Sequence, residues 1–362
     1  MLDFLYQQGI IEKYLFKKNN FITLFLRIIS IYSHEGGYMR ILVTGGAGFV
    51  GSHTVLQLKD QGHFIVVYDN LSKGHKQLLF GDEFVQGDIH DKKLLSKTMK
   101  KFNIEAVLHF AAFIEAGESM KLPVKYFNNN SVGSLVLLDA MIENKINFFV
   151  FSSTAALYGY PDMIPIKENS ALVPVNAYGE SKLLVEKVLH WYSEIYGLRY
   201  VSLRYFNAAG SDLQLRTGEM HNPETHLIPL ALQTAYGERE SLFIFGTDYN
   251  TKDGTCVRDY IHVTDLATAH LLALNYLSEG NKSNIFNLGS ETGYTVKEVI
   301  ETVKKHTNID FKVIETERRP GDPETLIASS EKIRSTLGWQ PQFSDIDTIV
   351  DSAMKFYKKW KI

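Results

Sequence analysis

The chain has 362 residues, of which 45% are hydrophobic and 22% charged, with a formal net charge of −3. That length and apolar content are enough for a large buried core, and the near-neutral charge gives no electrostatic footprint for a nucleic-acid partner. The single cysteine, Cys256, excludes a disulfide framework within the chain and is typical of the reducing cytoplasm, where we expect the protein to reside.

Residues 1–38 differ from the rest of the chain in their pattern of apolar and charged residues. An apolar run from Phe21 to Tyr32 follows a basic pair, as in a signal peptide or membrane anchor. The run is shorter than the roughly 18 residues of a spanning helix, and no small-x-small cleavage site follows it. Codons for Glu35-Gly36-Gly37 can read as a bacterial ribosome-binding sequence just before Met39. We therefore expect residues 1–38 to be a non-native leader, and we expect no membrane partner.

From Met39 onward, apolar strands alternate with helices. The first three elements are a strand at Arg40–Thr44, a helix at Gly51–Gln61 and a strand at His63–Tyr68. Each strand is a continuous apolar run, which is typical of a parallel sheet covered by helices on both faces. The sequence thus predicts an α/β fold with a Rossmann-type doubly wound parallel sheet. Further strands are expected at Ala106–Phe110, Phe148–Ser152 and Tyr200–Arg204, and further helices at Leu135–Asn144 and Tyr178–Tyr196.

The part of the chain after Asn207 is more broken, with shorter elements and Gly-containing loops. We interpret it as a smaller C-terminal substrate-binding domain at the carboxyl edge of the sheet, where ligands of such sheets bind. The expected organisation is an extension at 1–38, a dinucleotide-binding Rossmann domain at 39–206, and a mainly substrate-binding domain at 207–362. Some segments of the last part are expected to return to the Rossmann domain.

A Gly-rich turn, Thr44–Gly51, joins the first strand to the first helix. Its Gly46-x-Gly48-x-x-Gly51 pattern fits the dinucleotide fingerprint, in which glycines allow a tight turn and close approach of the backbone to pyrophosphate. The amides at the start of the helix then face the anion. Asp69, at the end of the second strand, can accept the adenosine ribose hydroxyls and would repel a 2′-phosphate. The pattern therefore predicts NAD rather than NADP.

Tyr178 and Lys182 stand four residues apart on a predicted helix, so they share one face of it. A free phenol has a pKa of about 10 and is a poor base at neutral pH, but a nearby ammonium and the positive nicotinamide ring favour the phenolate. Thr154 follows a buried strand, and its hydroxyl can bond the reacting sugar oxygen or Tyr178. The three side chains are therefore our candidate catalytic residues.

Together these motifs resemble the extended short-chain dehydrogenase/reductases, and among them the family of UDP-glucose 4-epimerases. The resemblance runs from Met39 to near the C-terminus. It implies a Rossmann domain with a small C-terminal domain, NAD as the cofactor, a UDP-sugar as the substrate, no metal, and a homodimer formed through a four-helix contact. The matching blocks are Thr44–Gly51, Asp69–Leu71, Gly87–Ile89, His109–Ala111, Gly117–Ser119, Tyr178–Lys182, Arg204–Asn207 and Val257–Val263.

The resemblance also implies roles for single residues. Two arginines would face the diphosphate, which suits the bidentate phosphate contacts of the guanidinium group. The residues expected to hold NAD are Gly45, Gly48, Phe49, Val50, Gly51, Asp69, Asn70, Asp88, Ile89, Phe110, Ala111, Asn129, Thr154, Tyr178, Lys182 and Phe206. Those expected to hold the UDP-sugar are Thr154, Tyr178, Asn207, His226, Leu227, Phe243, Phe245, Arg258, Arg319, Asp322 and Leu326.

The chain departs from the family pattern at three places. Thr154 stands where Ser is frequent, which preserves the hydroxyl, and His226 stands where many members have Asn. Family members often carry a Lys in the segment after His-Phe-Ala, where this chain has Ile114 and Glu115. A cationic contact to the cofactor is therefore not expected from that segment.

The reaction implied by the resemblance is 4-epimerisation of UDP-glucose and UDP-galactose. Tyr178 is expected to take the proton of the sugar 4-hydroxyl while hydride leaves C4 for NAD. The 4-keto-UDP-sugar then rotates and accepts the hydride on its other face, so no cofactor is consumed. UDP, bound far from the reacting carbon, positions that carbon.

Three alternatives remain open. An epimerase of another UDP-sugar, such as UDP-N-acetylglucosamine or a UDP-uronic acid, would keep all these motifs. A nucleotide-sugar 4,6-dehydratase would carry Asp-Glu after the Thr, where this chain has Ala155-Ala156. A non-catalytic dinucleotide sensor would be expected to lose Tyr178 or Lys182. Leu326 aligns with a position where Tyr is associated with refusal of N-acetyl sugars, so some activity on UDP-N-acetylglucosamine is expected.

Overall fold

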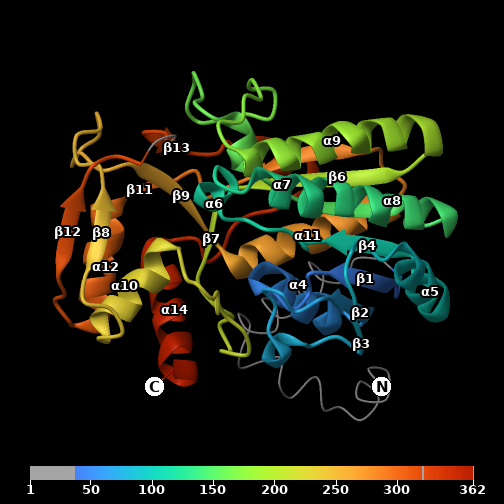
Figure 1. Cartoon of the computed structure of the whole chain (residues 1–362), viewed down its shortest axis with the longest axis horizontal. Helices are drawn as coiled ribbons and strands as arrows, with labels where there is room; N and C mark the ends of the chain where they lie inside the picture. The colour runs from blue at the N-terminus through green and yellow to red at the C-terminus, as the bar shows by residue number, and fades with distance from the viewer. Residues whose placement is uncertain (1–36, 320–321, 362) are drawn as a thin grey trace, which may run out of the picture. The chain divides into compact units, whose positions relative to one another are not determined.

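A computed structural model of the chain describes residues 37–319 and 322–361 (Figure 1). The expected leader lies outside these residues, apart from Gly37 and Tyr38. Tyr38–Ile362 form one compact unit. Within the described residues, no helix is both long enough and apolar enough to cross a membrane.

Seven parallel strands form the central sheet, in the order β10-β6-β5-β4-β1-β2-β3. This order reverses direction at β1, as in doubly wound dinucleotide-binding sheets, and confirms the predicted fold class. The middle strands are apolar on both faces because helices cover both, and Ile41, Leu42 and Val43 are fully buried. The strands are β1 (Arg40–Thr44), β2 (Phe64–Asp69), β3 (Glu83–Gln86), β4 (Ala106–His109), β5 (Phe148–Thr154), β6 (Arg199–Tyr205) and β10 (Asn284–Leu288).

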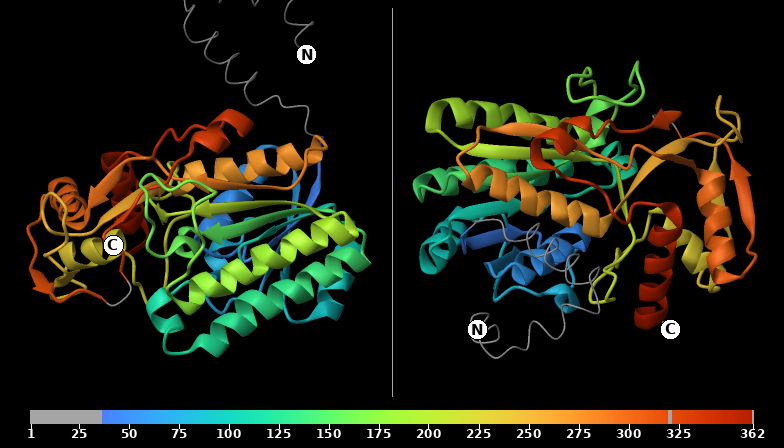
Figure 2. Two further views of the ribbon diagram at one scale, coloured as in Figure 1. Left: turned by 90° about the horizontal axis from the view of Figure 1, so that it is seen from above. Right: turned by 180° about the vertical axis from the view of Figure 1, so that it is seen from behind.

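Helices cover the two faces of this sheet in separate cores (Figure 2). α4 (Phe49–Asp60) and α11 (Val263–Ser278) lie on one face, while α5 (Lys92–Phe102), α8 (Gly133–Glu143) and α9 (Ala177–Tyr196) lie on the other. β10 and α11 come from the second half of the chain, and β10 pairs with β6 at the edge of the central sheet. The bounds predicted for β1, β2, β4, β5, β6, α4, α8 and α9 lie within two residues of the observed ones. No bounds were predicted for β3, β10, α5 and α11.

The helix that carries the Tyr/Lys pair has clear local start and stop signals. The Asn176 side chain accepts a hydrogen bond from the Gly179 amide at the start of α9. Gly197 ends the helix with φ of 71°, in the left-handed region that glycine adopts without strain. The sequence around α9 therefore fixes where its first turn begins, and with it the position of Tyr178.

Most of the elements after β6 form a lobe that begins at the carboxyl end of β6 (Figure 1). β7 (Asn207–Ala209) starts two residues after β6 and joins β9 (Val257–His262), β11 (Gly293–Thr295) and β13 (Thr325–Leu326) in a small sheet. β8 (Leu242–Phe245) and β12 (Val313–Thr316) form a parallel pair. The lobe has its own apolar core, to which α10 (Leu227–Ala235), α12 (Val296–Thr307) and α14 (Ile346–Lys361) contribute.

The other elements are short. They are α6 (Ala116–Ser119), α7 (Pro123–Tyr126), α13 (Glu331–Leu337), the π-helical turn Phe127–Val132, and the 3₁₀ turns Lys76–Leu78 and Ala155–Tyr158.

Candidate functional site

Three adjoining cavities run along the carboxyl edge of the sheet and into the lobe. We call them the outer cavity (about 80 Å³), the central cavity (about 280 Å³) and the lobe cavity (about 310 Å³). Neighbouring cavities share walls, so the three form one continuous line. The outer and central cavities share Gly45, Gly48, Lys73 and Ala112, and the central and lobe cavities share Asn207, Ala208, Glu219 and His226.

The Gly-rich turn between β1 and α4 borders the outer and central cavities and leaves no room for side chains. Gly45 has φ of 73°, and a Cβ there would lie 2.5 Å from the Ala111 amide nitrogen. A Cβ on Gly51 would lie 2.2 Å from the Gly45 carbonyl oxygen. The turn therefore requires glycine, and it presents the start of α4 to the cavity as an anion site.

The carboxylate of Asp69 lines the outer cavity at the end of β2. Its two oxygens accept hydrogen bonds from the amides of Ala47 (3.1 Å) and Leu71 (2.8 Å). Burial raises the pKa of Asp69, and these two hydrogen bonds counteract the increase. The orientation fits a carboxylate that accepts the two hydroxyls of a ribose. The turn and Asp69 together fit the adenosine and pyrophosphate parts of NAD.

All residues expected to hold NAD line the outer or central cavity except Asp88 and Lys182. Asp88 accepts hydrogen bonds from the side chain of Asn70 and the backbone amide of His90, both at 2.9 Å. It therefore holds the neighbouring loop in place.

Thr154 and Tyr178 meet in the central cavity, as expected. Thr154 ends β5 and Tyr178 lies in the first turn of α9, and their side chains are close enough for the Thr154 hydroxyl to affect the pKa of Tyr178. Burial raises the pKa of Tyr178, the Thr154 hydroxyl lowers it, and the charge of Glu115 raises it. The groups of the chain alone therefore keep this phenol protonated.

Lys182 lies one turn further along α9 and is only 3% exposed. Its Nζ donates a hydrogen bond to the Ser152 carbonyl oxygen (3.0 Å) and lies 4.8 Å from the centre of the Phe151 ring. Burial lowers the pKa of Lys182 to about 7, although the charge of Glu186 counteracts the decrease. In the chain alone, burial, Thr154 and Glu115 set the shift in the pKa of Tyr178, and Lys182 is not among its causes. The expected effect of this ammonium together with the nicotinamide ring stays a prediction.

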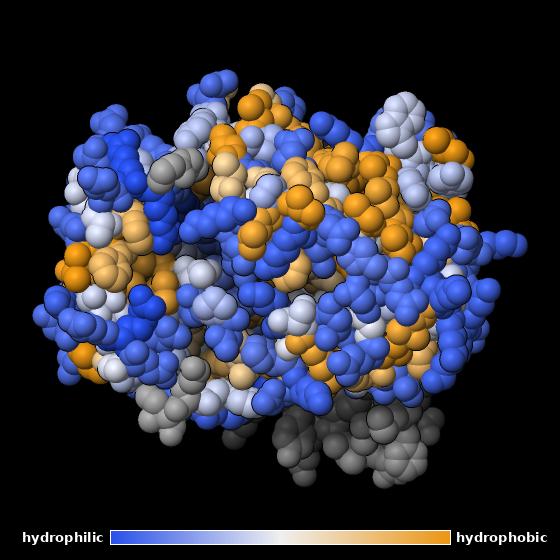
Figure 3. Space-filling view, viewed as in Figure 1, coloured by the Kyte–Doolittle hydropathy of each residue, from blue (hydrophilic) through white to orange (hydrophobic). Residues whose placement is uncertain are grey.

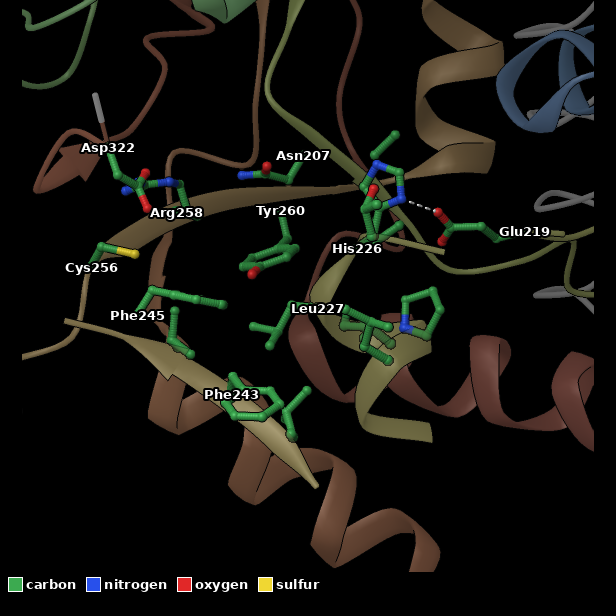
Figure 4. A pocket seen from close by; sticks show the side chains of 18 of the residues that line it. Asn207, Glu219, His226, Leu227, Phe243, Phe245, Cys256, Arg258, Tyr260 and Asp322 are labelled. Carbon is green, nitrogen blue, oxygen red and sulfur yellow. Dashed lines mark hydrogen bonds and ion pairs between the residues drawn. The ribbon is translucent and has the colours of Figure 1, made fainter. Parts of the chain in front are cut away.

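The lobe cavity combines aromatic rings with three arginines, Arg239, Arg258 and Arg319. Figure 4 shows Phe243, Phe245, Tyr260 and Arg258 around it. The guanidinium of Arg319 stacks on Phe245, with 3.7 Å between its central carbon and the ring centre. Arg258 forms an ion pair with Asp322. Such a cavity can hold a flat base between apolar side chains and a diphosphate against guanidinium groups. The expected residues that line it are Asn207, His226, Leu227, Phe243, Phe245, Arg258, Arg319 and Asp322.

Leu326 does not line any of the three cavities. It lies in β13, where it pairs with Arg258, and it packs with Phe206 against a small apolar cluster near Ala155. Phe206 does line the central cavity. Leu326 is therefore connected to the central cavity only through the cluster that it shares with Phe206.

Sequence reasoning missed a cluster between the central and lobe cavities. The ligand atoms of Glu219, His221, Glu224 and His226 all lie within 4.8 Å of one another, so these residues have the donors to hold a metal ion. However, His226 Nδ1 lies 2.8 Å from Glu219 Oε1 and 2.9 Å from Glu224 Oε1. Burial works to lower the pKa of His226, but the two carboxylates raise it well above its usual value. A proton on His226 thus balances the negative charge of these carboxylates. The alternation of Glu and His along this loop was the sequence signal that could have revealed the cluster.

Sequence reasoning also missed Lys73 and the place of Glu115. Lys73 lines the outer and central cavities, and Glu115 lines the central cavity. Their ion pair brings a cation to the segment from which none was expected. The only signal in the sequence was the position of Lys73 four residues after Asp69.

Residues 41–289 match the model of the NAD dependent epimerase/dehydratase family. A UDP-glucose 4-epimerase of Halalkalibacterium halodurans is 51% identical over 321 residues, which are 89% of this chain and 96% of that protein. The crystal structure of UDP-glucose 4-epimerase from Brucella ovis in complex with NAD is 46% identical, with a TM-score of 0.86, and covers 88% of this chain and 98% of that one. The UDP-Glc/GlcNAc 4-epimerase of Campylobacter jejuni is 44% identical, with a TM-score of 0.78, and covers 89% of this chain and 100% of that one. The chain therefore belongs to the NAD dependent epimerase/dehydratase family and is similar along nearly all of the described residues to its UDP-glucose 4-epimerases.

Proposed function

We propose that the chain is an NAD-dependent enzyme that interconverts UDP-glucose and UDP-galactose through a 4-keto-UDP-sugar. The observation that carries this function is the line of three cavities, with the hydroxyls of Thr154 and Tyr178 in the middle one. A dinucleotide in the outer and central cavities and a UDP group in the lobe cavity would meet at these hydroxyls. Relatives about half identical in sequence carry the same activity in their names.

Each residue of the central cavity has a role in this reaction. Tyr178 takes the proton of the sugar 4-hydroxyl and later returns a proton to the 4-keto oxygen. Thr154 orients the phenol and the reacting oxygen through its hydroxyl group. Lys182 connects α9 to β5, because its Nζ donates a hydrogen bond to the Ser152 carbonyl oxygen. When bound, NAD supplies the acceptor and donor of the hydride and a positive charge that favours the phenolate.

The lobe cavity anchors the sugar nucleotide while the keto sugar rotates. Arg258, Arg319 and protonated His226 place positive charge where the diphosphate would lie. Because the anchoring groups are remote from C4, they hold the substrate equally well with either face of the sugar turned toward the cofactor. We accordingly assign 39–206 to the NAD-binding domain, and 207–362 mainly to the UDP-sugar-binding domain.

Conversion of UDP-glucose to UDP-galactose by the purified protein, followed by proton NMR of the sugar anomeric signals, tests this function. We expect both sugars at equilibrium from either starting compound, without addition of a reductant. A protein that retains NAD but leaves both sugars unchanged would contradict the proposal. The dehydratase alternative lacks support because Ala155 and Ala156, in the turn after Thr154, offer no acid/base pair for the elimination of water.

We expect activity on UDP-N-acetylglucosamine beside UDP-glucose. Leu326 packs with Phe206 against one cluster, so a larger side chain at 326 would push into the central cavity. Leu326→Tyr is therefore expected to lower kcat/KM for the N-acetyl sugar by about 10–200-fold and to leave that for UDP-glucose within a few-fold. NMR assays of both sugars measure the ratio. Equal losses on both sugars, or no conversion of the N-acetyl sugar by the wild type, would contradict this expectation.

We also propose that the chain forms a homodimer through α8 and α9. Leu184, Trp191 and Ile195 are 40%, 61% and 65% exposed, and their spacing places them on one face of α9. Leu135 and Leu138 of α8 lie beside Leu184 and Val188 of α9, and Figure 3 shows apolar patches on this side of the molecule. An exposed apolar stripe of this kind is typical of a subunit interface.

Trp191→Asp is expected to convert the dimer to a monomer, because it places a charge within the apolar contact. Analytical ultracentrifugation measures the change, and Met163→Asp is the control, since Met163 is 76% exposed but lies in the loop before α9 and not on the apolar face of that helix. A Trp191→Asp protein that sediments like the wild type would contradict this interface. The free, buried thiol of Cys256 supports a cytoplasmic location.

A further inference from the structure

An ion pair joins the loops on the two sides of the Gly-rich turn. Lys73 lies in the loop after β2, and Glu115 lies in the loop after β4. In the sheet, β2 and β4 are the two neighbours of β1, and the Gly-rich turn follows β1. The distance from Lys73 Nζ to Glu115 Oε1 is 2.8 Å. The pair therefore bridges the two loops that flank the turn.

The pair lies where the outer cavity narrows into the central cavity. Lys73 lines both cavities together with Gly45 and Gly48. Glu115 lines the central cavity and is near enough to Tyr178 for its charge to raise the pKa of that phenol. A dinucleotide that occupies both cavities has its pyrophosphate at this narrowing, on the amides of the turn.

The Glu115 carboxylate is held in position to bind the ammonium group of Lys73. Its Oε2 accepts hydrogen bonds from the Tyr126 hydroxyl and the Ile114 amide, both at 3.2 Å, while Oε1 binds Lys73. Burial alone would raise the pKa of Glu115, but the hydrogen bond from Lys73 and those of the backbone lower it to about 2. The carboxylate is thus charged at every pH at which the protein is expected to work.

We propose that the Lys73–Glu115 ion pair is a clasp that closes over the pyrophosphate of the bound dinucleotide and slows its release. Lys73 supplies the positive charge beside the pyrophosphate, and Glu115 binds the Lys73 ammonium from the other side of the Gly-rich turn. The inference rests on the proposed NAD cofactor and goes beyond the reaction itself. An enzyme that returns its hydride in each cycle gains from slow release of the cofactor, because each departure interrupts turnover.

The rate of NAD release from the holoenzyme tests the clasp. The protein is loaded with NAD and transferred to NAD-free buffer, and the NAD that remains bound is measured over time in the absence of sugar. Lys73→Met is expected to release NAD at least about tenfold faster than the wild type, and Glu115→Gln to release it faster as well. Added salt should speed release from the wild type more than from Lys73→Met, since the contact is ionic.

Two further variants separate the clasp from a general structural effect. Lys59→Met breaks the Lys59–Asp82 ion pair of 3.0 Å, which lies outside the three cavities and whose lysine is about as exposed as Lys73. This variant should release NAD at the wild-type rate. In Lys73→Met/Ile114→Lys, a cation enters the central cavity from the side chain next to Glu115, and slow release should return. Thermal unfolding of the NAD-free variants shows whether each is folded.

The outcomes are distinct. If Lys73→Met releases NAD at the wild-type rate, or if Lys59→Met speeds release as much as Lys73→Met does, the clasp is overturned. A wild-type protein that binds no NAD overturns the clasp together with the cofactor assignment. A protein that shows the expected differences in NAD release but converts no UDP-sugar keeps the clasp and overturns only the proposed reaction.

Discussion

Tyr178→Phe is expected to lower kcat for UDP-glucose by about 10²–10⁴-fold, the usual contribution of a positioned acid/base group. The phenyl ring fills the same space, so the fold and the retention of NAD should stay nearly unchanged. The substitution removes only the hydroxyl, which lies near Thr154 and is expected to exchange a proton with the sugar. Initial rates of UDP-galactose formation at saturating substrate measure the loss.

Tyr205→Phe is the matched control for this substitution. Tyr205 lines the same central cavity, but its hydroxyl is hydrogen-bonded to Ser152 at 2.5 Å. Removal of the Tyr205 hydroxyl should lower kcat by less than about tenfold, as expected for the loss of one hydrogen bond of about 1 kcal/mol. A Tyr178→Phe enzyme that works at near wild-type rate would show that the proton passes through another group.

Arg204→Met is expected to lower the free energy of unfolding by about 3–5 kcal/mol, because it leaves a buried carboxylate without its partner. Arg204 on β6 and Glu186 on α9 form an ion pair of 2.6 Å with side chains only 3% and 4% exposed. The same guanidinium donates to the Tyr158 hydroxyl, and Glu186 also accepts a hydrogen bond from Ser153. The network ties α9, and with it Tyr178, to the sheet. Chemical denaturation of both proteins measures the difference.

The exposed pair of Lys167 and Glu331 provides the comparison. Its side chains are 59% and 75% exposed, so Lys167→Ala should change the free energy of unfolding by less than about 1 kcal/mol. The double variant Arg204→Met/Glu186→Met should recover part of the loss, since no unpaired charge stays buried. An Arg204→Met protein as stable as the wild type would mean that Glu186 is protonated or hydrated in the fold.

Much of the fold and of the site is predictable from the sequence because the responsible signals are local. The apolar run of β1, the glycines of its turn and the cap at Asn176 each act within a few residues. The pairing of Tyr178 with Thr154 also follows, since β5 ends beside the start of α9 in any sheet of this class.

Other features depend on contacts between distant segments and on burial. The Lys73–Glu115 pair requires that β2 and β4 flank β1, which no local pattern encodes. The raised pKa of Tyr178 follows from its burial, and the position of Lys182 at the Ser152 carbonyl depends on how α9 packs on β5. Leu326 was expected to contact the substrate but lines none of the three cavities, because alignment gives a residue its position in the chain and not the direction of its side chain.

The most direct test of the account is epimerisation in deuterated water. Purified protein with its bound NAD is incubated with UDP-glucose in D₂O, and the UDP-galactose formed is analysed by proton NMR at C4. Because the hydride leaves C4 and returns to C4 within one closed site, the account predicts a product with hydrogen, not deuterium, at this carbon. Deuterium at C4, or no UDP-galactose from a protein that retains NAD, would contradict it.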